Sequence, residues 1–357
     1  MEVRCVFGSV AGRFPWASSA LLDGLDEEFG PSNVGLSLGL AGLSMRGGLK
    51  ALKSYCAGNS ENGGKAGRRS TREYFDLGPE RLLVAELGEA MVPVSDDTKT
   101  SQDLLVVVGG NQENVQMKVK EYFEMALDIV DANWILSPHE PILDYSSRKV
   151  RDRAVLRTQK WAEQGLKSLA GNETFNGKFL FPVIGTSLED ALNFAHAMLE
   201  VAGSSWSEQY GLYFNTLSET EPSVRTEIVS GVLQVLRAKF PEAKDVTVLA
   251  NMGSASKREL GQIITAGANA IYSTLNIVET TMGRALTDTG NINLRNQDFA
   301  RDERPLLPGC KCWVCKNHTR SYFYHLVISR EMLAEMLLYT HNTHQLLDFA
   351  KQTSRKS

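Results

Sequence analysis

The residues with the clearest chemistry are three cysteines that crowd into one short segment. Cys310, Cys312 and Cys315 have the spacing Cys-X-Cys-X2-Cys. Thiolates are soft ligands and imidazole is a borderline one, so three cysteines and one histidine suit a tetrahedral Zn2+ without an open catalytic position. The pattern therefore predicts one structural zinc ion per chain. Spacing alone leaves the choice of histidine open among four downstream candidates: His318, His325, His341 and His344.

The remaining cysteines argue against other uses of the cluster. Cys5 and Cys56 stand alone in the sequence, so the five cysteines do not form the paired pattern of a disulfide framework. Neighbours as close as Cys310 and Cys312 also pair badly with each other, because such a disulfide is strained. An iron–sulfur centre normally takes four cysteines. A reduced cluster without metal is the other alternative.

The composition excludes several classes of protein. The 357 residues include 38 basic and 42 acidic side chains, a formal charge of −4, so the whole chain has no electrostatic footprint for nucleic acid. Any contact with RNA must be local or shared with a partner. No stretch has the roughly 18 apolar residues of a membrane span, and the first residues lack the apolar core of a signal peptide. These features predict a soluble, intracellular protein.

The elements that must position the cluster alternate regularly between predicted strands and helices. From residue 101 onward, short apolar runs alternate with amphipathic stretches near 115–130, 148–169, 188–203, 222–240 and 256–266, as in parallel β/α units. We expect a (β/α)8 barrel rather than an open doubly wound sheet, because no glycine-rich phosphate fingerprint follows the first strand. The predicted strands are Leu104–Val108, Trp134–Leu136, Phe179–Ile184, Gly211–Phe214, Val246–Ala250 and Ala270–Leu275.

Four regions are expected along the chain. Residues 1–100 form a divergent N-terminal part of the barrel with a flexible insertion, rich in Gly and Ser, near 57–72. Residues 101–287 hold the barrel units. Residues 288–350 form a zinc-binding subdomain with closing helices at about 317–327 and 330–350. A basic tail, 351–357, ends the chain.

The cysteine cluster and its surroundings resemble a known family. Cys310–Leu326 and Leu338–Asn342 are similar to the zinc signature of the tRNA-guanine transglycosylases, in which the position of His341 supplies the fourth ligand. Upstream, Arg157–Glu163 looks like the family's Arg-Thr-X-X-Trp helix, and three segments fall on family strand ends. Those segments are Leu180–Ser187, Gly211–Glu221 and Ala266–Tyr272. The resemblance covers about residues 103–350.

The resemblance implies a (β/α)8 barrel with an inserted zinc subdomain and an activity that exchanges guanine in tRNA for a queuine-type base. That chemistry uses an aspartate nucleophile, which forms a covalent bond to the ribose. Here Tyr272 stands at the nucleophile position, and a phenol with a pKa near 10 is a poor substitute. The family's Pro-Thr-Arg that follows becomes Asn276–Val278 or a near register.

The base-binding motifs also depart from the family pattern. Pro138-His139-Glu140 replaces Phe-Asp-Glu, and Gly185-Thr186-Ser187 replaces Gln-Gly-Gly. Asn215-Thr216 replaces a Gly-Gly pair, so side chains would obstruct the approach of a purine. A further essential aspartate lies in Ser-Asp-Ser-Gly-Gly-Phe-Gln, which we match to Val107–Gln112 without its acid. The combination resembles the non-catalytic accessory subunit of the eukaryotic enzyme.

The resemblance to the accessory subunit implies a heterodimer with a catalytic queuine tRNA-ribosyltransferase subunit. This heterodimer would act at wobble position 34 of tRNAs with GUN anticodons (Asp, Asn, His, Tyr). tRNA would be met through the complex, in the cytoplasm or at the outer face of mitochondria. Another hypothesis is a zinc-stabilised barrel with an unrelated scaffold role. An enzyme with displaced active-site residues is the main alternative, with four candidate acids: Glu140, Glu219, Glu221 and Glu279.

Overall fold

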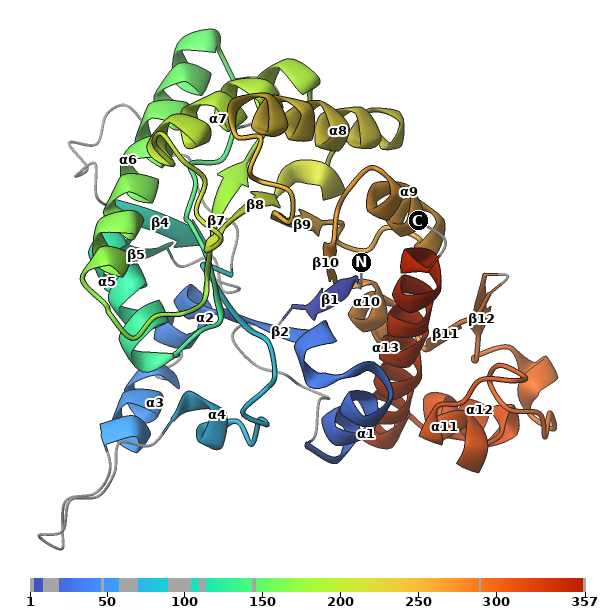
Figure 1. Cartoon of the computed structure of the whole chain (residues 1–357). Helices are drawn as coiled ribbons and strands as arrows, with labels where there is room; N and C mark the ends of the chain where they lie inside the picture. Colours follow the sequence, from blue (N-terminus) through green and yellow to red (C-terminus); the bar gives the residue numbers. More distant parts are fainter. Residues whose placement is uncertain are drawn as a thin grey trace, which may run out of the picture.

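The computed structural model describes residues 3–8, 19–45, 48–57, 70–88, 104–108, 114–142, 146–288 and 290–355. A ring of strands lies inside a layer of helices, and a smaller lobe extends from one side (Figure 1). Most of the insertion predicted near 57–72 lies outside the described residues, which resume at Ser70.

Eight parallel strands close the ring, which confirms the predicted barrel. They are β1 (Arg4–Phe7), β2 (Val34–Gly39), β3 (Leu83–Glu86), β6 (Trp134–Leu136), β7 (Lys178–Val183), β8 (Tyr210–Phe214), β9 (Thr247–Asn251) and β10 (Ala270–Ser273). Their order around the ring is β1-β10-β9-β8-β7-β6-β3-β2. The strands read as nearly continuous apolar runs because parallel strands are buried on both faces. Three of the eight lie within the first hundred residues.

The segment Leu104–Val108 was predicted as a barrel strand, and that prediction is wrong. It forms β4, which pairs antiparallel with β5 (Asn114–Lys118) in a separate two-stranded sheet. The helix expected from residue 115 begins only at α5 (Val119–Glu124) and continues as a π-helical turn, Met125–Ile129. A short apolar run looks the same in a buried barrel strand and in a hairpin, so periodicity could not separate them.

Helices cover the outside of the ring (Figure 1). Local signals set their starts: Ser187 accepts a hydrogen bond from the N–H of Asp190 at the start of α7, and Ser256 forms a capping box with Glu259 in α9. Besides α5, the described helices of this layer are α1 (Ser19–Phe29), α2 (Leu40–Met45), α3 (Gly48–Ala57), α4 (Thr71–Tyr74), α6 (Arg148–Ala170), α7 (Leu188–Val201), α8 (Pro222–Lys239), α9 (Lys257–Thr265) and α10 (Leu275–Thr281), with short 3-10 turns at η1 (Pro31–Asn33) and η3 (Thr216–Ser218).

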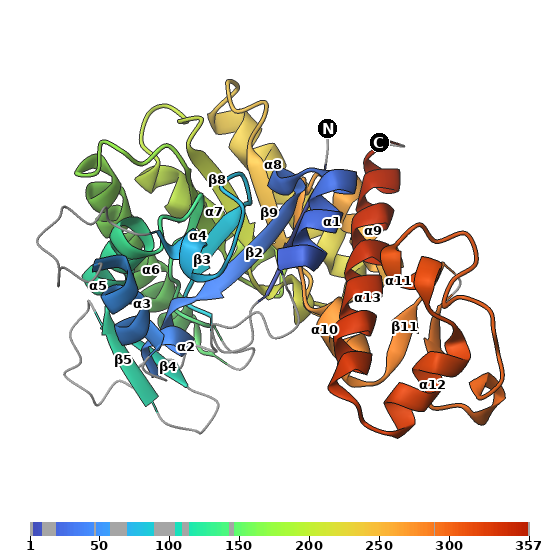
Figure 2. The ribbon, with the colours of Figure 1, turned by 90° about the horizontal axis from the view of Figure 1, so that it is seen from below.

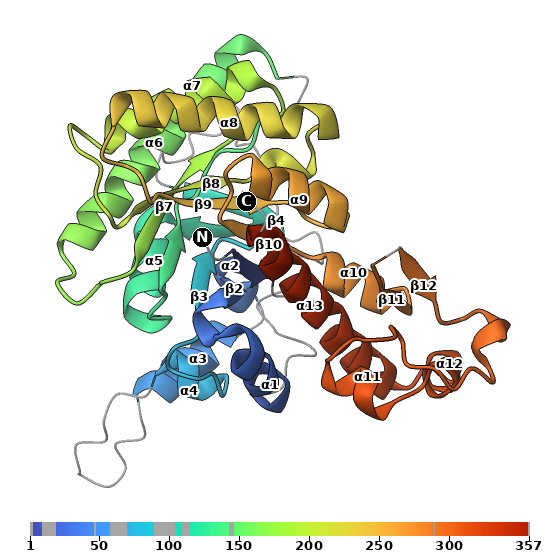
Figure 3. The same ribbon diagram turned by 45° about the vertical axis from the view of Figure 1, so that its right-hand side comes forward.

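The C-terminal lobe has its own small core. It contains the antiparallel pair β11 (Arg284–Leu286) and β12 (Asn291–Asn293), the turn η4 (Gln297–Phe299) and the helices α11 (Trp313–Asn317), α12 (Arg320–Ile328) and α13 (Met332–Ser354). Buried Leu294, Val314 and Phe323 pack together there. Figures 2 and 3 both show α13 between α1 of the barrel and the rest of the lobe.

Helix α13 belongs to both cores. Leu337 and Leu338, near its beginning, pack in the lobe, whereas Leu346, Leu347 and Ala350, further along, pack in the barrel core. The lobe is therefore attached to the barrel through one continuous helix as well as through the chain from α10 to β11. Among the described residues, none of the helices has the length and apolar character needed to cross a membrane.

Candidate metal centre and barrel-mouth pocket

The three cysteines meet at the start of α11. Cys310 lies in the loop before the helix and is half-buried, while Cys312 and Cys315 are buried. Cys312 occupies the N-cap position of α11, where its sulfur accepts a hydrogen bond of 3.4 Å from the N–H of Cys315. The X2 spacing brings these two side chains to one side of a single helical turn.

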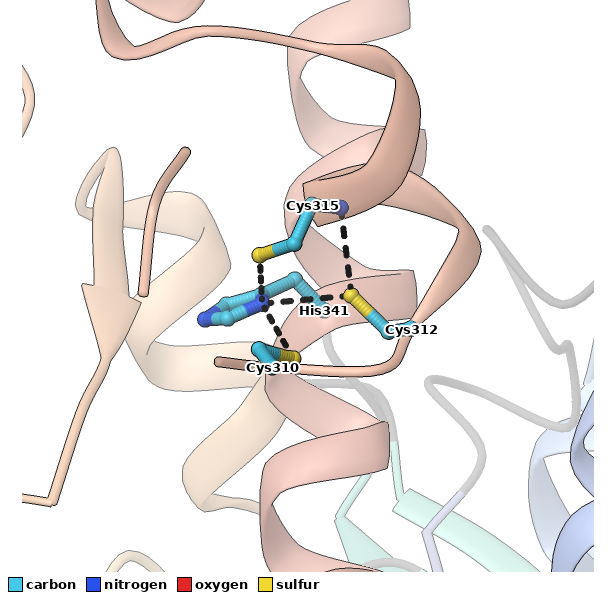
Figure 4. A group of neighbouring side chains, drawn as sticks. All are labelled: Cys310, Cys312, Cys315 and His341. Carbon is cyan, nitrogen blue, oxygen red and sulfur yellow. Dashed lines mark hydrogen bonds between the residues drawn. The ribbon is translucent and has the colours of Figure 1, made fainter. Parts of the chain in front are cut away.

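His341 enters the cluster from α13 (Figure 4). Its Nδ1 lies 3.9 Å from the sulfur of Cys310, 3.5 Å from that of Cys312 and 3.4 Å from that of Cys315. The four ligand atoms all lie within 4.8 Å of one another. The ring is fully buried, and its Nε2–H donates to the carbonyl oxygen of Leu286 at 2.9 Å. That bond leaves Nδ1 as the nitrogen that faces the sulfurs.

The other three histidines take different places. His318 stacks on Tyr322, with ring centroids 5.1 Å apart. His325 lies in α12, and His344 approaches only Cys310, with Nδ1 4.0 Å from the sulfur. The choice that spacing left open therefore falls on His341, as the resemblance implied.

The donor set and its dimensions fit zinc. A tetrahedral Zn2+ with bonds of about 2.3 Å to sulfur and 2.0 Å to nitrogen holds a sulfur and a nitrogen about 3.5 Å apart. The observed separations of 3.4 to 3.9 Å between Nδ1 and the sulfurs are close to that value. The four residues could hold a metal ion, and with four protein ligands the site is structural in type, because no position stays open for substrate.

The cysteines and His341 shift one another's pKa values, in different directions: hydrogen bonds to Cys310 and Cys315 raise the pKa of the Cys312 thiol. Hydrogen bonds from Cys312 and Cys315 lower the pKa of the Cys310 thiol. Burial alone lowers the pKa of His341, but its hydrogen bonds to the cysteines outweigh that effect and raise the pKa to about 9. A metal ion that binds here displaces protons from these groups, so we expect weaker binding in acid.

A groove runs beside the cluster, between the barrel and the lobe. We call it the metal-side groove; its volume is about 690 Å3. Trp313, at 60% exposure, is a large apolar side chain left largely open to solvent there. Acidic side chains of α1 and basic side chains next to the cysteines lie on its walls. Its lining includes Leu25, Glu28, Trp313, Lys316, Met336 and His344.

A second, smaller cavity of about 200 Å3 lies at the barrel mouth, where the C-terminal ends of the strands meet. This is the end at which TIM-barrel enzymes place their catalytic groups. Tyr272, from β10, lines it, and Gly8 after β1 makes room for the phenol, because a Cβ at residue 8 would overlap its hydroxyl group. Polar side chains from several strand ends share the cavity: Glu86, His139, Asn215 and Asn251.

Glu86 is the acid that the sequence interpretation missed. It is the last residue of β3, and its Oε1 accepts hydrogen bonds from the hydroxyls of Ser37 and Tyr272, the latter at 3.1 Å. Burial raises its pKa, although both hydrogen bonds act in the opposite direction. Burial and the nearby Glu86 also hold the pKa of Tyr272 well above its ordinary range, so the phenol stays un-ionised at neutral pH.

Hydrogen-bonded neutral side chains line the other side of the cavity. Nε2 of His139 lies 2.8 Å from Nδ2 of Asn215, whose Oδ1 accepts hydrogen bonds from the hydroxyl of Tyr213 and, at 3.1 Å, from Nδ2 of Asn251. Burial lowers the pKa of His139 to about 4, so it is neutral at pH 7. The hydroxyl of Thr216 bonds instead to the backbone of Gly185, at 3.0 and 2.8 Å.

The four acids of the enzyme hypothesis do not line this cavity. Glu140 pairs with Arg157 at 3.0 Å, Glu279 pairs with Arg284 at 2.7 Å, and both are buried. Glu219 and Glu221 are exposed to solvent.

The Arg-Thr-X-X-Trp segment has a clear structural role on α6. Besides the ion pair of Arg157, the hydroxyl of Thr158 accepts a hydrogen bond from the N–H of Glu140, and Trp161 is fully buried. The segment therefore fixes the loop that follows β6 and carries His139 to the cavity.

The match of Val107–Gln112 to the motif with the essential aspartate also needs correction. Val107 and Val108 belong to the hairpin strand β4, outside the barrel, and residues 109–113 lie outside the described part of the chain. The strand that brings a carboxyl group to the barrel mouth is β3, through Glu86.

The closed barrel with a Cys3His cluster in a C-terminal lobe defines a TIM-type barrel protein with a candidate structural metal centre. Within that class, the family model described as queuine tRNA-ribosyltransferase matches residues 80–356, well over half of the chain. The chain therefore belongs to this family.

Curated relatives include two kinds of family member. The queuine tRNA-ribosyltransferase accessory subunit 2 of Anopheles gambiae is 29% identical over 222 residues, 58% of this chain and 51% of the relative. The same subunit of Trichoplax adhaerens is 48% identical over 68 residues, 18% of each chain. The queuine tRNA-ribosyltransferase of a Cyanothece strain is 28% identical over 209 residues, 58% and 51% of the two chains. The longer of these alignments span about half the length of the relatives.

Proposed function

We propose that this chain is the non-catalytic accessory subunit of a queuine tRNA-ribosyltransferase. It pairs with a catalytic subunit, and the heterodimer exchanges guanine for queuine at wobble position 34 of tRNAs with GUN anticodons. Among the similar proteins, those of Anopheles gambiae, Trichoplax adhaerens and Culex quinquefasciatus are named accessory subunit 2. In this proposal the bound zinc is structural, and the complex meets tRNA in the cytoplasm or at the outer face of mitochondria.

The observation that carries the proposal is the hydrogen bond between Tyr272 and Glu86. Base exchange through a covalent intermediate needs a free carboxylate beside the anomeric carbon of the ribose. At this barrel mouth a phenol replaces the expected nucleophile, and it engages one oxygen of the carboxyl group of Glu86. The cavity has only about 200 Å3, and Asn215 and His139, which bond to each other, form part of its wall.

The metal centre supports the partner role. Its ligands hold the lobe core together, and the lobe forms one wall of the metal-side groove. Exposed apolar side chains there, Trp313 and Leu333, stand beside lysines on one wall and acids on the other. Aromatic anchors surrounded by polar groups are typical of protein interfaces. We assign the groove to the catalytic subunit.

An exchange assay tests the role. The purified chain, a catalytic relative from the same cell and their mixture are each given labelled guanine or queuine and a tRNA with a GUN anticodon. We expect no incorporation by the chain alone and full incorporation only by the mixture, which also elutes as a one-to-one complex. Incorporation by the chain alone supports the enzyme hypothesis instead. Failure to associate with any transglycosylase supports the scaffold hypothesis.

The Tyr272→Phe variant is the matched control. It keeps the ring and removes only the hydroxyl, so the mixture should retain full activity if this pocket performs no chemistry. A large loss of turnover in a mixture that still forms the complex would place catalysis at this barrel mouth.

A further inference from the structure

The imidazole of His344 lies between the candidate metal centre and the barrel. It comes from α13, one turn after His341, and is buried, with 5% of its side chain exposed. Nδ1 is 4.0 Å from the sulfur of Cys310, and Nε2 is 2.9 Å from Oε2 of Glu28 on α1. One ring therefore contacts a ligand of the metal centre on one side and the first helix of the barrel on the other.

The contact with α1 has three parts besides that bond. The ring of Phe29 meets His344 edge to face, with centroids 5.2 Å apart. Nζ of Lys351, further along α13, lies 5.1 Å from the centroid of the Phe29 ring and donates to the carbonyl oxygen of Glu28 at 3.1 Å. These contacts fix α1 against α13, so the position of the Glu28 carboxylate is defined rather than left to a mobile surface side chain.

Cys310 is the ligand that needs such support. It lies in a loop and is half-buried, whereas Cys312 and Cys315 are buried at the helix. Its sulfur accepts a hydrogen bond of 3.3 Å from Nε2 of Gln345, and Nζ of Lys257 in turn donates to Oε1 of Gln345 at 3.2 Å. His344 and Gln345 thus approach the same sulfur. Groups that contact a ligand from outside orient it, and their removal typically weakens metal binding about 10- to 100-fold.

We propose that Cys310, His344 and Glu28 form a link that couples metal binding to the placement of α1. His344 is a positioning residue: it holds the loop ligand on one side and the α1 wall of the metal-side groove on the other. Glu28 and His344 both line that groove. Metal binding therefore shapes the surface that we assign to the partner. The inference rests on the proposed zinc site but not on the accessory role.

Two measurements on the full-length chain test the link. Zinc affinity is measured by competition with a chelator, and backbone amide exchange of α1 is measured with zinc bound and after its removal. His344→Phe keeps a ring against Phe29 and removes both nitrogens. Glu28→Ala breaks the link at its far end and leaves the metal surroundings intact. Glu27→Ala changes the neighbouring exposed acid of the same helix and is the matched control.

We expect His344→Phe to weaken zinc affinity at least tenfold. In the unaltered chain and in Glu27→Ala, zinc removal should speed amide exchange in α1 severalfold. In Glu28→Ala, exchange in α1 should be fast whether or not zinc is bound. Zinc affinity within twofold of the unaltered chain in His344→Phe would overturn the proposal.

If His344→Phe does not fold, amide exchange of α1 in Glu28→Ala tests the link instead. A zinc response of α1 in Glu28→Ala equal to that of the unaltered chain would also overturn the link. Absence of zinc binding by the unaltered chain overturns the metal centre itself and the link with it. Failure of the accessory role appears only in the exchange assay and leaves both measurements here unaffected.

Discussion

The hydroxyl of Tyr272 donates a 3.1 Å hydrogen bond to Glu86 across the barrel mouth, although β1 and β2 stand between the strands that carry them. Tyr272 was recognisable in the sequence as a departure from a family motif. Its acceptor was not, because Glu86 ends a strand in the weakly patterned first hundred residues. The phenol and the carboxyl group, which could each take part in catalysis, are instead hydrogen-bonded to each other.

Glu86→Gln should raise the free energy of unfolding, relative to the unaltered chain, more at pH 8 than at pH 5. The raised pKa means that the unfolded chain loses the proton of this carboxyl group at lower pH than the folded chain does. Stability from this group is therefore complete below the ordinary pKa of glutamate and is lost as pH rises. Glu86→Gln removes that loss and keeps an acceptor for Ser37 and Tyr272. Urea unfolding at both pH values measures the difference.

Glu140→Gln is the contrasting variant. That acid is buried and paired with Arg157, so its replacement should destabilise the fold at pH 8 by about 3 kcal/mol, because the guanidinium loses its counter-charge. A Glu86→Gln effect of the same size at both pH values would contradict the assignment of the pH dependence to Glu86.

Acid should weaken the fold through His139. Burial lowers its pKa from 6.5 to about 4, so between these values the unfolded chain binds a proton that the folded chain does not. The free energy of unfolding should fall by about 3 kcal/mol as pH drops through this window, and His139→Asn should remove that part of the slope. His196, an exposed histidine on α7, gives the control variant His196→Asn, whose slope should match that of the unaltered chain.

Restoring an acid at position 272 should not restore exchange. Tyr272→Asp places a second carboxyl group near Glu86 and leaves space where the ring was, so we expect destabilisation on the order of 3 kcal/mol at neutral pH. Asn215 and His139 still line the cavity, at positions where the family resemblance implies base-binding groups. Incorporation of labelled guanine measures exchange by the variant, and unfolding by urea measures its loss of stability. Recovered turnover by the variant alone would contradict the proposed role.

Removal of metal should melt the lobe. We expect a chelator to lower the unfolding temperature on the order of 10 °C, because the ligands hold α11 against α13 and the core around Phe323. Cys312→Ser should bind no zinc and should not respond to the chelator. Cys56→Ser, a buried cysteine outside the cluster, should behave like the unaltered chain in metal content. Calorimetry with metal analysis on the same samples measures this.

A charge in the metal-side groove should weaken the complex. Trp313→Glu is expected to reduce affinity for the catalytic subunit about 30-fold or more, because a largely exposed aromatic side chain is a typical interface anchor. Ile328, 52% exposed on α12 and outside the groove, provides the control Ile328→Glu. Equal binding by both variants in titration calorimetry would place the interface elsewhere.

The fold from residue 134 onward was the part that the sequence could predict. The strands from β6 to β10 and the helices from α6 to α9 lie where alternation of apolar runs and amphipathic stretches placed them. The cysteines were equally clear, because few other roles require three thiols at that spacing. The histidine needed the family resemblance, since reach from α13 depends on a tertiary contact that spacing does not contain.

The errors have a common physical origin. Leu104–Val108 is apolar and ends in three β-branched valines, which is typical of a strand but does not identify its partner. β4 pairs with β5 instead of entering the ring. The loss of β3 from the prediction then hid Glu86. Its strand is only Leu83–Glu86, too short for alternation to reveal which side chain faces the barrel mouth.

Helix α13 has a geometric consequence for the whole molecule. Its early residues Leu337 and His341 belong to the lobe, and its later residues Leu346 and Ala350 belong to the barrel core. An α-helix turns by about 100° and advances 1.5 Å with each residue. One residue inserted between His341 and Leu346 would therefore swing the lobe around the helix axis by more than a quarter turn. The number of residues between His341 and Leu346 therefore sets the orientation of the metal centre relative to the barrel.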